Sequence, residues 1–179
     1  GKFDESIEAY EKAIKLKPNF AEVYNNLGIT FKEIGKFDES IEAYEKAIKL
    51  KPNFAEAYNN IGIVYKELKK FDKSANNYLK AIKIKSDYAE AYYNYVNLLT
   101  EIQKINDAIF NYKKAIELND RYYEAYNNLG NLLKDIVKIN DAQKYLDKLI
   151  KLKPDHIGYK INRNLLIPPI CANCTEISY

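Results

Sequence analysis

Few side chains in this 179-residue chain are of a type and spacing that could support metal or redox chemistry. Cys171 and Cys174 form a CxxC pair, which is the spacing of half a structural zinc site or of a redox pair. A structural zinc site needs four ligands, yet the chain has no second cysteine pair, and His156 is its only histidine. We therefore predict an incidental cysteine pair, with no metal site and no cofactor.

Catalytic groups are equally sparse. With a single histidine, no nucleophile can be matched with a neighbouring base, and no glycine-rich phosphate loop occurs. Adjacent carboxylates such as Asp38 and Glu39 stand where a helix is expected to start, and capping of that helix by Asp38 explains them. His156 occupies a place where earlier repeats carry an aromatic residue, so we expect it to pack at a helix end. The prediction is that the catalytic set is empty and that this chain by itself is not an enzyme.

Charge excludes two further classes of partner. The 28 basic and 25 acidic side chains are interleaved, and the net charge is only +3. Such a mixture creates no basic face for nucleic acid and no strong attraction to an anionic membrane. Apolar runs are a few residues long, too short to span a bilayer. Most of the 17 tyrosines fall at spacings expected to be buried, which argues against base stacking. We predict neither nucleic acid nor membrane as a partner.

Asparagines, in contrast, recur at a fixed interval. Asn26, Asn60, Asn94 and Asn128 are spaced 34 residues apart. A primary amide offers two donors and an acceptor with two lone pairs, enough to pair with a peptide N–H and C=O together. A ladder of such amides can hold an extended backbone. The alternative interpretation is that these asparagines cap or bridge neighbouring helices, and the two interpretations are compatible.

The asparagine interval is the period of the whole sequence. Residues 1–22 recur without change as residues 35–56, and the pattern continues more loosely to about residue 156. A fixed period in this range indicates an array of supersecondary units, each stacked on its neighbours. Within residues 21–54, apolar residues follow helical spacing before and after Gly35, which is suited to a left-handed helix end. Pro52 then blocks continuation, so each unit is predicted to be two antiparallel helices.

The order of these residues resembles the tetratricopeptide repeat. The first unit carries Tyr24, Leu27-Gly28, Phe31, Ser40, Tyr44, Ala47 and Pro52, and three later units repeat the pattern. The resemblance implies an all-α fold, a right-handed α-solenoid of helix pairs, whose first helices line a concave groove that binds proteins. Val96 stands where the other units have glycine, so we expect altered helix packing there.

The phase of the repeat predicts the domain boundaries. Residues 1–20 are expected to be the second helix of a truncated repeat, and residues 157–179 a short helix and tail that could lead to a missing domain. Between them lie four full units at 21–54, 55–88, 89–122 and 123–156. The chain lacks methionine and begins within a repeat, so we expect a piece of a longer, cytoplasmic polypeptide.

Core packing is expected to leave one stripe of each first helix free, at the second, fifth, sixth, ninth, twelfth and thirteenth positions of the unit. The peptide-binding groove predicted from this stripe comprises Asn25, Asn26, Ile29, Lys32, Asn59, Asn60, Ile63, Lys66, Tyr93, Asn94, Asn97, Asn127, Asn128, Asn131 and Lys134. The resulting hypothesis is a protein–protein interaction module that binds an extended or helical peptide segment.

Two alternatives and one exclusion accompany this hypothesis. The asparagine ladder resembles that of O-linked N-acetylglucosamine transferases, and LLIPPICANCTEISY at the C-terminus resembles a junction in related proteins, which implies a substrate-recruiting arm. The open N-terminal helix, with Phe3, Ile7 and Tyr10, predicts end-to-end self-association or a scaffold role. Chaperone tails of Hsp70 and Hsp90 are excluded as partners, because Asn25, Glu56 and Glu90 stand where a carboxylate clamp needs basic residues.

Overall fold

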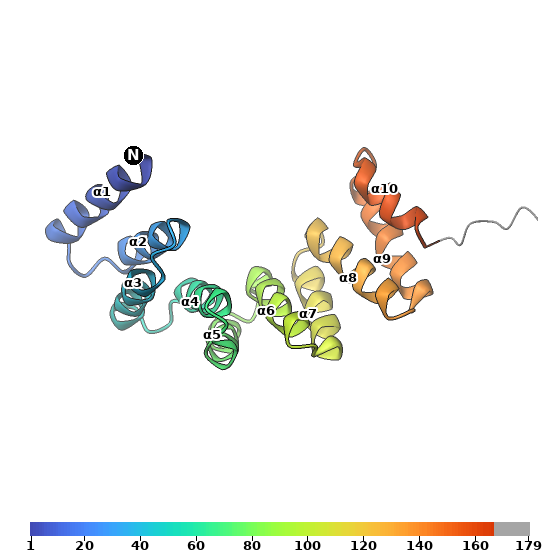
Figure 1. Cartoon of the computed structure of the whole chain (residues 1–179), viewed down its shortest axis with the longest axis horizontal. Helices are drawn as coiled ribbons and strands as arrows, with labels where there is room; N and C mark the ends of the chain where they lie inside the picture. The colour runs from blue at the N-terminus through green and yellow to red at the C-terminus, as the bar shows by residue number, and fades with distance from the viewer. Residues whose placement is uncertain (167–179) are drawn as a thin grey trace, which may run out of the picture. The chain divides into compact units, whose positions relative to one another are not determined.

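The computed structural model describes residues 1–166, and this part of the chain is entirely helical (Figure 1). The helices are α1 (Lys2–Leu16), α2 (Ala21–Glu33), α3 (Phe37–Leu50), α4 (Ala55–Glu67), α5 (Phe71–Ile84), α6 (Ala89–Glu101), α7 (Ile105–Leu118), α8 (Tyr123–Asp135), α9 (Ile139–Leu152) and α10 (Ile157–Asn164). The predicted all-α class is confirmed.

Two compact units make up the chain, Gly1–Asn111 and Tyr112–Tyr179, and the division falls within α7. In the first unit the strongest packing is inside each pair, α2 on α3 and α4 on α5. Each second helix also packs on the next first helix, and the first helices α2, α4 and α6 contact one another in turn. In the second unit α8 packs on α9, and α10 packs on α9. Stacking of helix pairs on their neighbours buries a core that no single pair could form.

Close packing inside a pair depends on glycine. A Cβ added to Gly62 would lie 2.8 Å from the ring of Tyr78, and one added to Gly28 would lie 2.7 Å from the ring of Tyr44. Both tyrosines are completely buried. The hydroxyl of Ser74 donates a 2.7 Å hydrogen bond to the carbonyl oxygen of Gly62 across the same contact. The glycine therefore provides the space that lets the two helices approach and the carbonyl that links them.

Every turn inside a described helix pair uses a left-handed residue at one position. The predicted left-handed helix end at Gly35 is confirmed, with φ of 76°. Lys69, Gln103 and Val137 hold the equivalent place in the next pairs with φ of 57°, 58° and 61°. The predicted capping role of Asp38 is wrong, because α3 begins at Phe37 and no side-chain hydrogen bond caps it. Asp38 instead lies in the first turn, where its charge favours the helix N-terminus.

The helix α1 shows what α3 looks like without a partner on one side. The two share their sequence, but α3 buries Ser40, Ala43, Tyr44 and Ala47, whereas α1 has no buried residue. Phe3 is 49% exposed, as expected, while Ile7 and Tyr10 are half-buried. End-to-end association through this helix stays a prediction.

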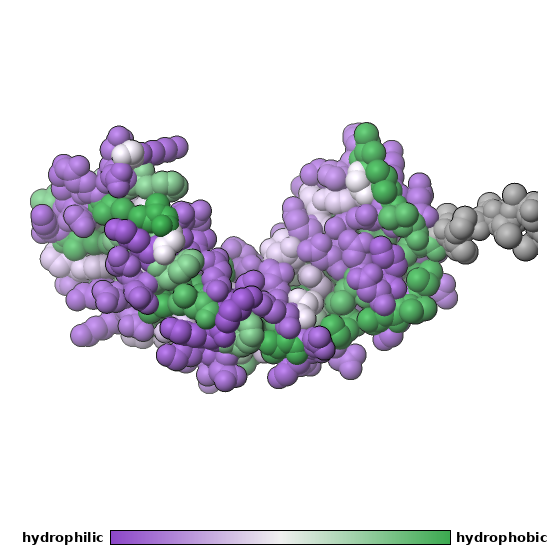
Figure 2. Space-filling view, in the orientation of Figure 1, coloured by the Kyte–Doolittle hydropathy of each residue, from purple (hydrophilic) through white to green (hydrophobic). Residues whose placement is uncertain are grey.

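The short helix predicted after residue 156 is present as α10. Ile157, Ile161 and Leu165 form a hydrophobic stripe on it, 73%, 53% and 65% exposed, and the stripe is visible in Figure 2. Arg163 and Asn164 stand where α2 and α8 carry leucine and glycine. The side chain of Arg163 donates a 2.8 Å hydrogen bond to Asp147 of α9. A polar residue pair thus replaces the apolar face on which a second helix would pack.

Candidate functional site

The predicted groove residues lie on the first helices of the repeats. In the first unit they come from α2, α4 and α6, and because these helices contact one another, their stripes lie side by side. In the second unit the corresponding residues come from α8. We call the surface formed by the second, fifth, sixth, ninth, twelfth and thirteenth positions of α2, α4 and α6 the first-helix face.

Side-chain amides connect successive repeats across this face. The Nδ2 of Asn60 donates to the Oδ1 of Asn25 at 3.1 Å. One repeat later, the Nδ2 of Asn94 donates to the Oδ1 of Asn59 at 3.2 Å. In both bonds the sixth-position amide of one repeat reaches the fifth-position amide of the preceding one. We call these hydrogen bonds between asparagines of successive repeats the amide ladder.

The sequence predicts an exposed side chain at the fifth position, but in α2 and α4 this side chain is buried. Asn25 is only 7% exposed and Asn59 is fully buried. Each lies close to the contact between neighbouring first helices, where its oxygen accepts the bond from the next repeat. Asn60 and Asn94 are half-buried, and Asn26 is exposed. Asn25 and Asn59 are therefore suited to position the sixth-position amides, which lie nearer the surface.

The second unit contains an equivalent bond, which involves a residue that the sequence reasoning missed. The Nδ2 of Asn162 in α10 donates to the Oδ1 of Asn127 in α8 at 2.8 Å. Asn127 in turn donates to its neighbour Asn128 at 3.2 Å. Asn162 follows Asn128 by 34 residues, so the period itself was a sufficient signal. Because the two residues after Asn162 are not leucine and glycine, the sequence pattern did not identify α10 as a first helix.

Apolar side chains lie among the amides. Ile29 is 37% exposed, and Ile63 and Tyr93 are half-buried. Asn97 and Asn131 replace the isoleucine at the ninth position in later repeats, and both are half-buried. The face is therefore mixed in character.

Charges around the face are largely paired. Lys32 contacts Glu33 at 2.7 Å, and Lys66 lies 3.9 Å from Glu101. At the second position, Glu22 pairs with Lys51 at 2.9 Å, and this bond holds the pKa of Glu22 below its usual range. The equivalent Glu56 pairs with Lys85 at 3.3 Å. Lys134 of α8 is half-buried. Such alternating charge favours no strongly acidic or basic ligand.

Other residues singled out by the sequence lie apart from this face. His156 precedes α10, is exposed, and stacks on the ring of Tyr159 with centroids 3.8 Å apart. Cys171 and Cys174 lie outside the described residues, as does most of the proposed junction to a glycosyltransferase domain. Within residues 1–166, no cluster of three potential metal ligands is found. No helix of that part reaches the length and hydrophobicity that a membrane crossing requires.

Family comparison accords with this helical architecture. A profile described as a TPR repeat matches residues 1–35, 30–69 and 97–136, which together make up more than half of the chain. The chain belongs to the tetratricopeptide repeat family. Two further tetratricopeptide profiles match residues 55–88 and 123–156. Comparison with curated proteins found no match.

Solved structures of other tetratricopeptide proteins are similar in fold. A crystal structure of MamA is 28% identical, with a TM-score of 0.75 over 85% of this chain and 89% of that one. YrrB, described as a TPR protein with an unusual peptide-binding site, is 22% identical, with a TM-score of 0.72 over 89% and 82%. A thermophilic TPR protein of Thermus thermophilus, TTC0263, is 16% identical, with a TM-score of 0.73 over 93% and 91%. The tetratricopeptide α-solenoid is thus established as the fold.

Proposed function

We propose that this tetratricopeptide chain, as a protein-interaction module, binds an extended peptide segment of a partner protein along its first-helix face. The observation that carries the proposal is the amide ladder, in which Asn60 and Asn94 are held by hydrogen bonds to the preceding repeat. The predicted groove residues keep this role as part of the proposal, with Asn25 and Asn59 positioning the amides instead of contacting the peptide.

The chemistry of a primary amide explains how the ladder would work. In the first unit, the amide of Asn60, like that of Asn94, uses one of its two N–H groups in the bond to the preceding repeat. Because a primary amide has two N–H groups and one carbonyl oxygen, its second N–H and its carbonyl oxygen remain for a ligand. An extended peptide offers a matching N–H and C=O at regular intervals along its backbone. The ladder therefore favours recognition of backbone, with little demand on side-chain sequence.

Fixing the amides in advance should also favour binding. A free asparagine loses rotamer freedom when it contacts a ligand, at a cost of about 0.5–1.5 kcal/mol per side chain. The bonds to the buried Asn25 and Asn59 already restrict Asn60 and Asn94 in the unbound chain. Ile29, Ile63 and Tyr93 supply apolar contacts beside them. YrrB is described as carrying a peptide-binding site, which supports the view that this fold can present one.

The test is a selection of 12-residue peptides from a random library on the wild-type chain, followed by titration calorimetry of the best binder. Replacing both Asn60 and Asn94 by alanine should weaken that binder at least about tenfold, corresponding to about 1.4 kcal/mol. Circular dichroism should show unchanged helix content, so that loss of binding is not loss of fold.

The matched control replaces Asn76 by alanine. Asn76 is an exposed asparagine on the second helix α5, away from the first-helix face. The control variant should bind as the wild type does. Equal affinity for wild type and the Asn60→Ala/Asn94→Ala variant would contradict the proposal, and so would failure to select any binder.

A further inference from the structure

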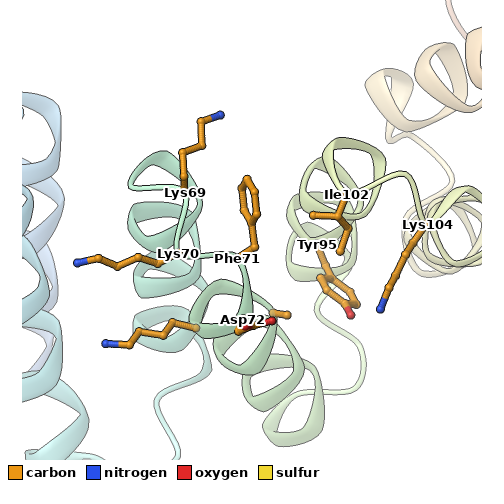
Figure 3. A pocket seen from close by; sticks show the side chains of 9 residues that line it. Lys69, Lys70, Phe71, Asp72, Tyr95, Ile102 and Lys104 are labelled. Atoms are coloured by element: carbon orange, nitrogen blue, oxygen red, sulfur yellow. The ribbon is translucent and has the colours of Figure 1, made fainter.

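A surface hollow of about 670 Å³ lies between α5 and α6, beside the turns that follow α4 and α6. Its apolar wall is made by Phe71, Ala75, Tyr95 and Ile102. Figure 3 shows Phe71 on the α5 side of the gap, facing Tyr95 and Ile102 on the α6 side. The hollow is within the size range of sites that bind small ligands or single anchoring side chains.

Two departures from the repeat line this hollow, Ala75 and Tyr95. Tyr95 stands where the other units have leucine or isoleucine. Ala75 is the twenty-first residue of its unit, where the preceding unit has Ile41 and the next has Ile109. Ile41 packs against the buried cluster of Tyr44, Ile61 and Val64. An alanine in place of this isoleucine removes three carbon atoms and leaves empty the space that the longer side chain would fill. The hollow is therefore a local departure from the repeat.

The walls of the hollow are held by packing. Tyr95 stacks at a tilt on Tyr78, with ring centroids 5.9 Å apart, and Tyr78 is fully buried. Phe71 is the first residue of α5, and Ile102 is the C-cap residue directly after α6, so both are held at helix termini. The site is thus preformed, which lowers the ordering cost of binding.

Lysines dominate the rim. Lys69, Lys70, Lys73 and Lys104 line it together with a single acid, Asp72. Two of these cations are already engaged: Lys69 is paired with Glu101, and Lys73 lies 5.4 Å from the ring centroid of Tyr65. Figure 3 shows Lys70 pointing away from the hollow and Lys104 beside Tyr95, so Lys104 is the cation best placed to meet an acidic partner. An apolar hollow with a basic rim is complementary to an apolar side chain flanked by carboxylates.

We propose that the hollow above Ala75 is a second docking site, which takes one large apolar side chain of a partner segment, with acidic residues on either side of it. The apolar group enters between Phe71 and Tyr95, and a flanking carboxylate approaches Lys104. This site uses the turn edge of α5 and α6, and no residue of the amide ladder takes part in it.

The probe is the pentapeptide acetyl-Glu-Asp-Phe-Asp-Glu-amide, titrated into the full chain carrying ¹³C-labelled alanine methyl groups. Saturable shifts are expected at the methyl of Ala75. Ala75→Ile introduces the residue found at 41 and 109, so the fold should accept it, and it fills the hollow. Followed by calorimetry, this variant should bind at least about tenfold more weakly. The matched control Ala75→Ser keeps the volume nearly unchanged and should bind as the wild type does.

Two further variants separate this proposal from the amide ladder. Lys104→Glu should weaken binding of the pentapeptide severalfold, and more at low than at high salt. Asn60→Ala/Asn94→Ala should leave its binding unchanged. The proposal is overturned if Ala75 shows no saturable shift up to about 10 mM peptide, if Ala75→Ile binds as well as the wild type, or if the asparagine variant abolishes binding. It is also overturned if a peptide with serine in place of phenylalanine binds equally well.

Discussion

The side-chain Nδ2 of Asn60 in α4 donates a hydrogen bond to the Oδ1 of Asn25 in α2, 3.1 Å away and one repeat earlier. Asn94 repeats the relationship with Asn59 at 3.2 Å. The acceptors are buried and the donors lie nearer the surface. The same amides therefore link neighbouring repeats and shape the proposed peptide site. The bridging interpretation of the asparagines is correct for these pairs, and the peptide-binding interpretation remains the proposal.

Replacing Asn60 by alanine should lower the free energy of unfolding by about 1–3 kcal/mol, because the Oδ1 of Asn25 is left without this donor in a buried place. Urea unfolding followed by circular dichroism measures this. Asn26→Ala is the control, since Asn26 holds the same position but is exposed, and it should change the value by less than about 0.5 kcal/mol. Equal effects from the two substitutions would argue against a structural role for the bond.

Gly62→Ala should destabilise the chain by about 1–3 kcal/mol, because the new Cβ would lie 2.8 Å from the fully buried ring of Tyr78. Helix propensity alone would favour alanine by about 1 kcal/mol, so the sign of the change decides between the two effects. Gly158→Ala serves as the control: its Cβ would meet only the exposed His156 at 3.2 Å, and stability should stay equal or rise. Thermal unfolding of both variants provides the comparison. A stabilised Gly62→Ala variant would show that α4 and α5 can move apart far enough to accept the new Cβ.

Val137→Gly should raise stability by about 1 kcal/mol. Val137 has φ of 61°, and left-handed backbone costs a residue with a Cβ about 1–2 kcal/mol. Gly35 occupies the equivalent place in the first pair with φ of 76° and open space around it. The reciprocal change Gly35→Val should therefore destabilise by a similar amount. Denaturant midpoints measure both changes, and shifts of the same sign would show that backbone strain does not govern these turns.

Stability should fall in strong alkali. Burial raises the pKa of Tyr44 and of Tyr78 well above the ordinary value of 10. The folded chain holds both phenols neutral, whereas the unfolded chain ionises them near pH 10. Their contribution is therefore complete below about pH 10 and is lost as the pH rises further, by about 1.4 kcal/mol per pH unit for each tyrosine. Urea unfolding between pH 8 and 12 tests this, and Tyr44→Phe/Tyr78→Phe should give a shallower decline. If the double substitution leaves the decline of stability with pH unchanged, the two buried tyrosines are not its cause.

The repeat period was sufficient to predict the helices and much of the core. Tyr44, Tyr78 and Leu146 stand at equivalent places in their units, and each faces a glycine of the preceding helix. Contacts inside a helix pair follow from sequence because the pair is set by local spacing and turn chemistry. The capping role of Asp38 failed because the helix begins two residues earlier than expected, with Lys36 at the N-cap position.

Contacts between repeats were harder to foresee. The burial of Asn25 and Asn59 depends on the rotation of α4 relative to α2 and of α6 relative to α4, which spacing along one helix does not determine. The hollow above Ala75 required a comparison of the twenty-first residue in each unit, together with knowledge of what Ile41 fills. Asn162 follows the 34-residue period, yet the polar Arg163 after it does not match the apolar residue of the repeat pattern.

The most direct test of the central claim is the nuclear magnetic resonance spectrum of the asparagine side-chain amides during titration with the library-selected peptide. If the amide ladder binds the peptide, the Nδ2–H signals of Asn60 and Asn94 shift and saturate with the dissociation constant found by calorimetry. Signals of Asn76, on the second helix α5, should stay in place. Shifts confined to second-helix residues, with Asn60 and Asn94 unmoved at saturation, would contradict peptide binding by the amide ladder.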